Sequence, residues 1–183
     1  MVQNIFYWLL FYVAWFWCLW WGVRDHTFIA VIGGAASIIF QLQLFYVSRR
    51  QLFYQDLAVV LCTIFCGALI EFLFLNNALL VYTTDSRSYS FFPPLWVLIL
   101  YPMFGLTVNH SLKFLSARPW LFALAGAIGA PITYLSCRGF GVVLFPEDIE
   151  RSVAVIAVVW AGFLFVLSLG NNRIEKMLSI SLE

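Results

Sequence analysis

The chain has 183 residues, of which 63% are hydrophobic and only 10% are charged, and its formal net charge is +1. A soluble domain typically carries about 25% charged residues, so this chain cannot cover a globular surface with polar groups, and lipid must take that role. The small net charge gives no field that would favour nucleic acid or an acidic partner. Composition therefore predicts an integral membrane protein that does not bind nucleic acid.

Six apolar runs, each long enough to cross a bilayer as a helix, follow one another along the chain. The first run lacks the basic start and the cleavage site of a signal peptide, so we expect it to be retained. A short amphipathic turn is expected after the last run. We predict one all-α domain over residues 1–183, a bundle of six transmembrane helices at about residues 4–22, 27–47, 57–82, 94–112, 119–136 and 152–170.

Small residues spaced for close helix contact occur in several of these runs. Helix backbones approach closely where such residues share a face. On this basis we expect helix-packing roles for Gly33, Ser37, Gly67, Gly126, Gly129 and Ala130. Pro102 and Pro131 lie inside spans, where proline removes a backbone hydrogen bond, so both are predicted to kink their helices.

Glu71 is the one acidic residue that these boundaries place well inside a span. A charge at the bilayer centre costs roughly 2.5–3.5 kcal/mol on insertion scales. Helical spacing puts Thr63, Gly67 and Glu71 on one stripe, so the acid is expected to face the bundle. Two interpretations stay open: a site for a proton or a ligand headgroup, and a protonated acid held between helices by hydrogen bonds.

Asn109 and His110 are expected in the last turn of the fourth span, and Tyr134 ends the small-residue stretch of the fifth. Together with Glu71 they are the candidate ligand or proton residues. One histidine and one asparagine are a thin basis for acid–base catalysis, so we prefer a structural role for this pair. The four cysteines show neither disulfide nor zinc spacing, and we expect no metal and no cofactor: Cys18, Cys62, Cys66 and Cys137.

Basic residues are unevenly divided between the two ends of the predicted bundle. Six lie on the side that carries both termini, against four on the other, and the short loops hold the excess. The positive-inside rule then places both termini in the cytoplasm. The six are Arg49, Arg50, Lys113, Arg118, Arg173 and Lys176.

Three stretches in order resemble a family of small bacterial inner-membrane proteins known as domain of unknown function 2878: PPLW at 93–96, NHSL at 109–112 and GAIGAPITY at 126–134. The resemblance implies a multi-pass inner-membrane protein and assigns no activity. It also implies proximity to lipid-modifying enzymes, cyclopropane-type fatty acid synthases among them, because their genes are often neighbours. Two departures from the family are Glu71, where it tends to have Asp, and Ala130, where it tends to have Gly.

Three functional hypotheses follow. The first is a non-enzymatic lipid-binding or scaffold component of envelope lipid handling, with membrane lipid and a lipid-modifying enzyme as partners. The second is a small proton-coupled carrier that uses Glu71. The third is an intramembrane lipid-modifying enzyme that uses Asn109 and His110. We prefer the first, because the sequence contains no nucleotide-binding, metalloprotease or nucleophile-elbow motif.

Overall fold

The computed structural model describes residues 2–48, 53–83 and 92–180, and they form a helical bundle, as predicted. The two strands are short and pair antiparallel, Val81 with Leu144 and Tyr82 with Val143. In chain order the elements are α1 Val2–Gly22, α2 Thr27–Ser48, α3 Phe53–Asn76, β1 Val81–Tyr82, α4 Leu95–Leu98, α5 Leu100–Val108, α6 Lys113–Ser116, α7 Pro119–Gly139, β2 Val143–Leu144 and α8 Ile149–Ile180.

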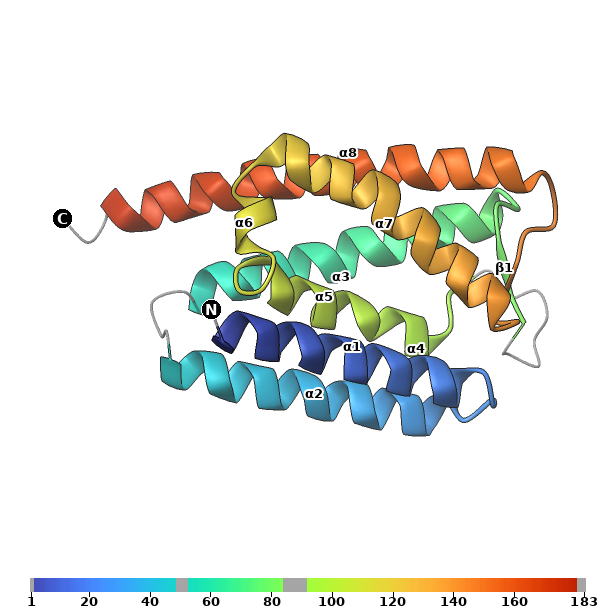
Figure 1. Cartoon of the computed structure of the whole chain (residues 1–183), viewed down its shortest axis with the longest axis horizontal. Coiled ribbons are helices and arrows are strands. Elements are labelled where there is room, and N and C mark those ends of the chain that lie inside the picture. The colour runs from blue at the N-terminus through green and yellow to red at the C-terminus, as the bar shows by residue number, and fades with distance from the viewer. Residues whose placement is uncertain (1, 49–52, 84–91, 181–183) are drawn as a thin grey trace.

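The long helices run back and forth along one axis, and both ends of the chain lie at the same end of the bundle (Figure 1). α1 packs along α2, α3 along α5, and α7 along α8. The strand pair and the turns around it close the opposite end (Figure 1). The bundle is therefore built largely from pairs of helices that pack side by side.

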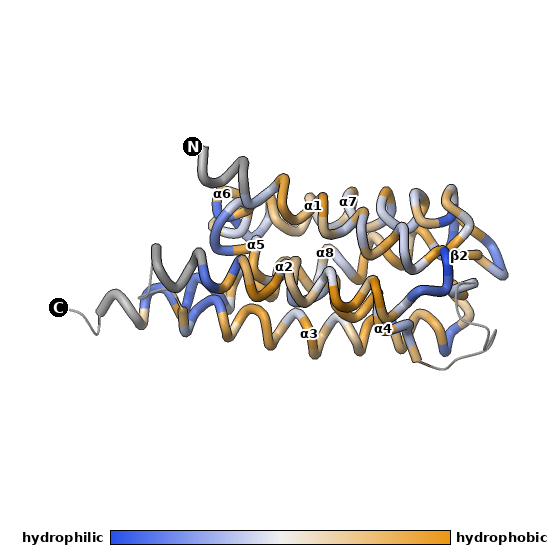
Figure 2. Tube along the Cα trace, turned by 90° about the horizontal axis from the view of Figure 1, so that it is seen from below, coloured by the Kyte–Doolittle hydropathy of each residue, from blue (hydrophilic) through white to orange (hydrophobic). Residues whose placement is uncertain are grey.

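Three helices, α3, α7 and α8, are long and apolar enough to cross a membrane. Two shorter apolar helical stretches accompany them, Thr27–Gln43 and Leu95–Val108. Figure 2 shows hydrophobic residues along the middle of the bundle and hydrophilic residues gathered towards its two ends. This distribution is the one that a protein surrounded by lipid needs.

The third span ends earlier than the sequence suggested. α3 stops at Asn76, and the expected stretch up to residue 82 instead turns back and forms β1. Asn76 and Asn77 donate side-chain hydrogen bonds to the carbonyls of Phe72 and Leu73. Ala78 then adopts a left-handed φ of 53°, a conformation that ends a helix.

The fourth span is not one helix over 94–112. It consists of α4 and α5, which are separated at Ile99. Pro102 has no N–H to offer the carbonyl of Leu98, and its ring crowds that carbonyl. The predicted break therefore falls one turn before the proline. Asn109 and His110 lie in the turn after α5 rather than in its last helical turn.

The last span extends beyond its predicted limits at both ends, because α8 runs without interruption from Ile149 to Ile180. The tail is thus a continuation of α8, not a separate surface turn. Asp148 accepts a hydrogen bond from the backbone N–H of Glu150 (2.9 Å) and so caps the helix start. Arg49 and Arg50, on which the predicted orientation partly depends, lie outside the described residues.

The small residues differ in what they contact. A Cβ built at Gly33 would lie 2.0 Å from the Trp17 ring of α1, and one at Gly126 would lie 2.7 Å from the Trp160 carbonyl of α8. Both positions are close helix contacts. Gly129 is different, because a Cβ there would meet no atom within 4 Å. The structure therefore shows no helix in contact with Gly129 among the described residues.

The structure also shows the surroundings of the remaining residues that were predicted to pack against helices or to kink them. A Cβ at Gly67 would lie 2.1 Å from the ring of Tyr101. Ala130 is buried in the main core cluster. Ser37 is buried and accepts a hydrogen bond from Gln41, one turn later on α2. Pro131 lies inside α7, which continues through it.

Candidate functional site

Glu71 lies in the third helix and is almost completely buried, with 1% of its surface exposed. Three tyrosine hydroxyls surround its carboxyl group. They come from three other elements: Tyr82 from β1, Tyr101 from α5 and Tyr134 from α7. Residues far apart in the sequence are thus joined at one acid, which we call the Glu71–tyrosine cluster.

All three phenols are within hydrogen-bonding distance of the carboxyl oxygens. Tyr101 Oη lies 2.7 Å and Tyr134 Oη 2.5 Å from Oε1 of Glu71, and Tyr82 Oη lies 2.9 Å from Oε2. Burial, followed by the charge of Glu71, raises the pKa of Tyr82 well above its ordinary value. The Tyr82 phenol therefore keeps its proton at neutral pH and can donate it to the carboxyl group.

The geometry explains why Gly67 stands one turn before Glu71. The ring of Tyr101 lies over Gly67, where any larger side chain would collide with it. This close contact brings the Tyr101 hydroxyl to Glu71. Sequence reasoning named Glu71 and Tyr134 but missed Tyr82 and Tyr101. The available signal was that a buried tyrosine needs a partner for its hydroxyl.

A groove of about 570 Å³ lies against this cluster, a size that is usual for small-molecule sites. α1 lines it with aromatic side chains, and α7 lines it mainly with small ones, Gly129 among them. Trp160 of α8 also contributes and stacks on Tyr101, with ring centroids 6.1 Å apart. Gly129 has no packing partner because it faces this space. The aromatic contribution of α1 is Trp8, Phe11, Tyr12, Trp15 and Phe16.

The groove is open to its surroundings rather than sealed. Phe16 and Ile132, from opposite sides of the lining, are 52% and 58% exposed. Its walls are mainly apolar, and its polar groups include the Glu71–tyrosine cluster, two threonines, a serine and the Tyr12 hydroxyl. An apolar tail and one polar end are thus both accommodated in the same space.

A second buried polar cluster lies near the end of the bundle that carries the termini. Asp56 of α3 is 2% exposed and binds both candidates from the turn after α5. Asn109 Nδ2 donates to Asp56 Oδ1 at 2.9 Å, and His110 Nε2 lies 3.0 Å from Asp56 Oδ2. The Tyr7 ring meets His110 edge-on, with centroids 5.7 Å apart. Sequence reasoning missed Asp56, because it placed this residue just outside the third span.

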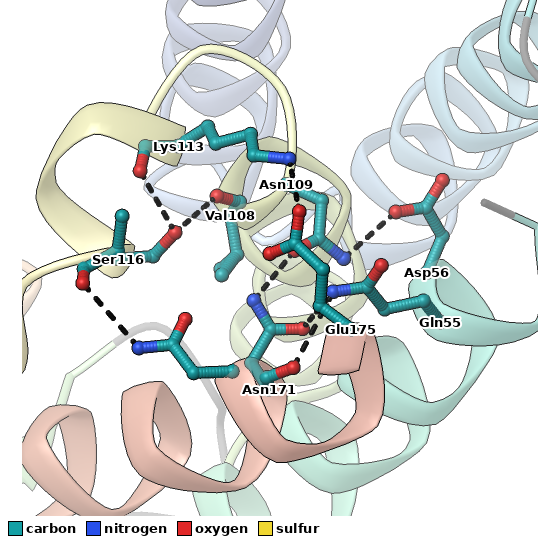
Figure 3. Close-up of polar contacts among 10 residues, drawn as sticks. Gln55, Asp56, Val108, Asn109, Lys113, Ser116, Asn171 and Glu175 are labelled. Carbon is teal, nitrogen blue, oxygen red and sulfur yellow. Dashed lines mark hydrogen bonds and ion pairs between the residues drawn. The ribbon is translucent and has the colours of Figure 1, made fainter. Parts of the chain in front are cut away.

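Amide side chains extend this second cluster to α8 (Figure 3). Asn171 Nδ2 donates to Asn109 Oδ1 at 2.7 Å, and Gln55 Nε2 donates to Asn171 Oδ1 at 2.8 Å. A half-exposed ion pair between Lys113 and Glu175 (2.7 Å) lies beside it (Figure 3). Through these hydrogen bonds the cluster joins α3, the turn after α5 and α8.

The two clusters are separate. Asp56 and Glu71 are fifteen positions apart on α3, which corresponds to about 22 Å along a helix axis. The four candidate residues are therefore divided: Tyr134 joins Glu71, while Asn109 and His110 join Asp56. Among the described residues, no group of three or more histidine, cysteine, aspartate or glutamate side chains could hold a metal ion.

Comparison with known proteins identifies one family that matches this chain. The family described as "Protein of unknown function (DUF2878)" matches residues 4–166, in agreement with the resemblance in the three sequence stretches. No curated protein and no solved structure matches the chain.

Proposed function

The chain belongs to the family described as a protein of unknown function (DUF2878), and on that premise we propose that it is an integral membrane protein that binds a lipid. The lipid lies in the groove between α1 and α7, with its polar end at the Glu71–tyrosine cluster. The observation that carries this proposal is that the apolar groove ends on a buried, fully hydrogen-bonded carboxyl group.

The walls of the groove support an apolar tail. Bulky aromatic residues of α1 and small residues of α7 line it, and Gly129, where a built Cβ meets no atom within 4 Å, leaves space unfilled. A groove of this kind on the surface of a soluble protein would be a liability, but in a bilayer it is filled by hydrocarbon chains. A bound lipid can enter laterally, because the lining includes exposed residues such as Phe16 and Ile132.

The location belongs to the proposal as well. The chain crosses the bacterial inner membrane six times, with both termini in the cytoplasm. The direction of successive helices in Figure 1 supports an even number of crossings, because the two ends of the chain lie together. Acting without catalysis of its own, the protein presents or stores a lipid for a lipid-modifying enzyme.

The alternatives receive unequal support. A carrier that uses Glu71 is supported by the contact between Glu71 and Tyr134, which joins α3 to α7 beside the groove. The enzyme hypothesis requires the Asn109 and His110 side chains to meet a substrate. Both side chains are directed at Asp56 instead, and neither is among the described residues that line the groove.

Filling the groove tests the proposal. Gly129→Leu places a bulky side chain in the open space beside α7, and we expect it to reduce bound lipid at least about tenfold, since the tail loses its position. Native mass spectrometry of the purified protein measures the retained lipid.

The matched control is Gly162→Leu. Gly162 is also an exposed helical glycine with no atom within 4 Å of a built Cβ, but it lies on α8 outside the groove. We expect its lipid content to equal that of the original chain. Equal lipid content in both variants would contradict the proposal.

A further inference from the structure

Among the residues that the structure describes, no positively charged side chain is bonded to the Glu71 carboxyl group. The hydrogen-bonding partners of its carboxyl group are the three phenols. The groove lining that the structure describes contains no lysine, arginine or histidine. A buried charge is normally paired with an opposite charge, and none of the described residues that line the groove supplies one to Glu71.

All three phenols donate their protons to the carboxyl oxygens of Glu71. Hydrogen bonds donated to a carboxylate favour its ionised form, and an ionised carboxylate only accepts hydrogen bonds. The three phenols supply no positive charge, so an ionised Glu71 leaves a net negative charge at the inner wall of the groove.

We propose that the polar end of the ligand is a cation, an amine or a quaternary ammonium group carried on an apolar tail. This inference rests on the proposed function, because it assigns the chemistry of the group that meets the Glu71–tyrosine cluster. An ammonium group gains a Coulomb attraction to Glu71 that is stronger in an apolar groove than in water. It also gains contacts with the aromatic faces that line the groove, which attract cations.

The same geometry disfavours the headgroups of ordinary anionic lipids. A phosphate would approach a like charge and would find no basic side chain in the described lining. The three phenol protons are already engaged with Glu71, so they are not free to bind it. An alcohol can donate one hydrogen bond to a phenol oxygen, but it brings no opposite charge.

A headgroup series on one tail separates these ligands. Dodecyltrimethylammonium, dodecanol and dodecyl phosphate have the same twelve-carbon chain and differ in charge. Each is titrated into the purified full-length protein in a non-ionic detergent, and binding is followed by tryptophan fluorescence. We expect the ammonium ligand to bind at least about tenfold more tightly than the alcohol, and the phosphate to bind most weakly.

Substitution of Glu71 tests whether its carboxyl group causes the preference for the ammonium ligand over the alcohol. Glu71→Gln removes the charge and keeps the shape, so the preference for ammonium over alcohol should fall to about onefold. Glu150→Gln, the same change at an exposed acid of α8 outside the groove, should leave the preference intact. If Glu71→Gln does not fold, the ranking of the three ligands on the unmodified protein decides the matter alone.

The outcomes distinguish this inference from the proposed function. Equal affinity for ammonium and alcohol, with both weakened by Gly129→Leu, would overturn the cationic headgroup and leave the groove as a lipid site. Tightest binding of the phosphate would likewise overturn it. Binding of all three ligands that Gly129→Leu does not weaken would overturn the proposed function as well.

Discussion

Glu71 illustrates, at the scale of one residue, how a carboxyl group is kept inside an apolar bundle. Three hydroxyls from different elements are hydrogen-bonded to it, so each side chain stabilises the position of the others. A buried hydrogen bond to a charged group contributes about 1.5–3 kcal/mol. The cluster is therefore both a candidate binding site and part of what holds α3, α5 and α7 together.

Removal of one hydroxyl should be measurable. We expect Tyr101→Phe to lower the free energy of unfolding by about 1.5–3 kcal/mol, since Glu71 loses a donor and gains none. Tyr54→Phe is the control, because Tyr54 is 74% exposed on the same bundle and should change stability by less than about 0.5 kcal/mol. Thermal unfolding in detergent measures both. A loss of equal size in the two variants would argue against the cluster.

Asp56 is the second buried acid described above, and removing its carboxyl group leaves two buried side chains without this hydrogen-bond acceptor. We expect Asp56→Ala to destabilise the protein by about 3–5 kcal/mol, because Asn109 and His110 both lose an acceptor inside the bundle. Glu175→Ala breaks the half-exposed pair with Lys113 and should cost less than about 1 kcal/mol. Denaturant titration of the two variants ranks them, and the reverse order would refute this assignment.

At the scale of the element, the fit of α3 against α5 depends in part on the missing side chain of Gly67. Gly67 lets the Tyr101 ring lie directly on the α3 backbone. In the middle of a helix, glycine is otherwise unfavourable by about 1 kcal/mol relative to alanine. The contact with the Tyr101 ring explains why glycine stands at this position in α3.

The matched pair Gly67→Ala and Gly162→Ala tests this contact. At Gly67 a methyl group would collide with the ring, so we expect a loss of about 1–3 kcal/mol in stability. At Gly162 the methyl group meets nothing, and we expect a gain of about 0.5–1 kcal/mol from helix propensity. Thermal unfolding shows whether each variant is destabilised or stabilised. Stabilisation by Gly67→Ala would show that α3 and α5 do not approach as closely as described.

At the scale of the whole molecule, the two buried clusters join the helix pairs at different levels of the bundle. The Glu71–tyrosine cluster connects α3 and α5 to α7, and the Asp56 cluster connects α3 to α8. Between these connections α7 and α1 are separated by the groove.

The proposed six crossings predict which loops face outwards. In a background without native cysteines, Glu147→Cys in the turn before α8 should react with a membrane-impermeant thiol reagent added to intact cells. Arg118→Cys before α7 should react only after the membrane is opened. Both side chains are exposed, so access to the reagent depends on topology alone. Labelling of Arg118→Cys from outside would reverse or abolish the proposed orientation.

Much of the architecture could be predicted from residue type and order, because it depends on local interactions with the surrounding medium. Long apolar runs must form helices in lipid, since every backbone polar group has to be satisfied within the segment. Helices therefore appear in the expected stretches, but their ends differ, as at Asn76 and Ile180, and the fourth is divided at Ile99. Those ends depend on particular contacts, such as the left-handed turn at Ala78, which periodicity does not encode.

The candidate site was only half visible in the sequence. An acid inside a span is conspicuous, so Glu71 was found. Its partners Tyr82 and Tyr101 were not identified, because tyrosines are common near membranes. The role of a tyrosine becomes visible only when the contact of its hydroxyl group is known. Asp56 was missed for a similar reason. An acidic residue at the start of a helix is expected to be exposed to solvent, and only the packing of other elements buries it.

The sequence by itself therefore determined the helical class, the apolar character of the long helices and the position of the buried acid along its helix, all of which follow from local composition and period. Only the tertiary structure decided that Tyr134 belongs with Glu71 while His110 belongs with Asp56, and that Gly129 faces a groove and not a helix. These relations join residues up to 63 positions apart, and hydrogen bonds act over about 3 Å in space regardless of separation along the chain.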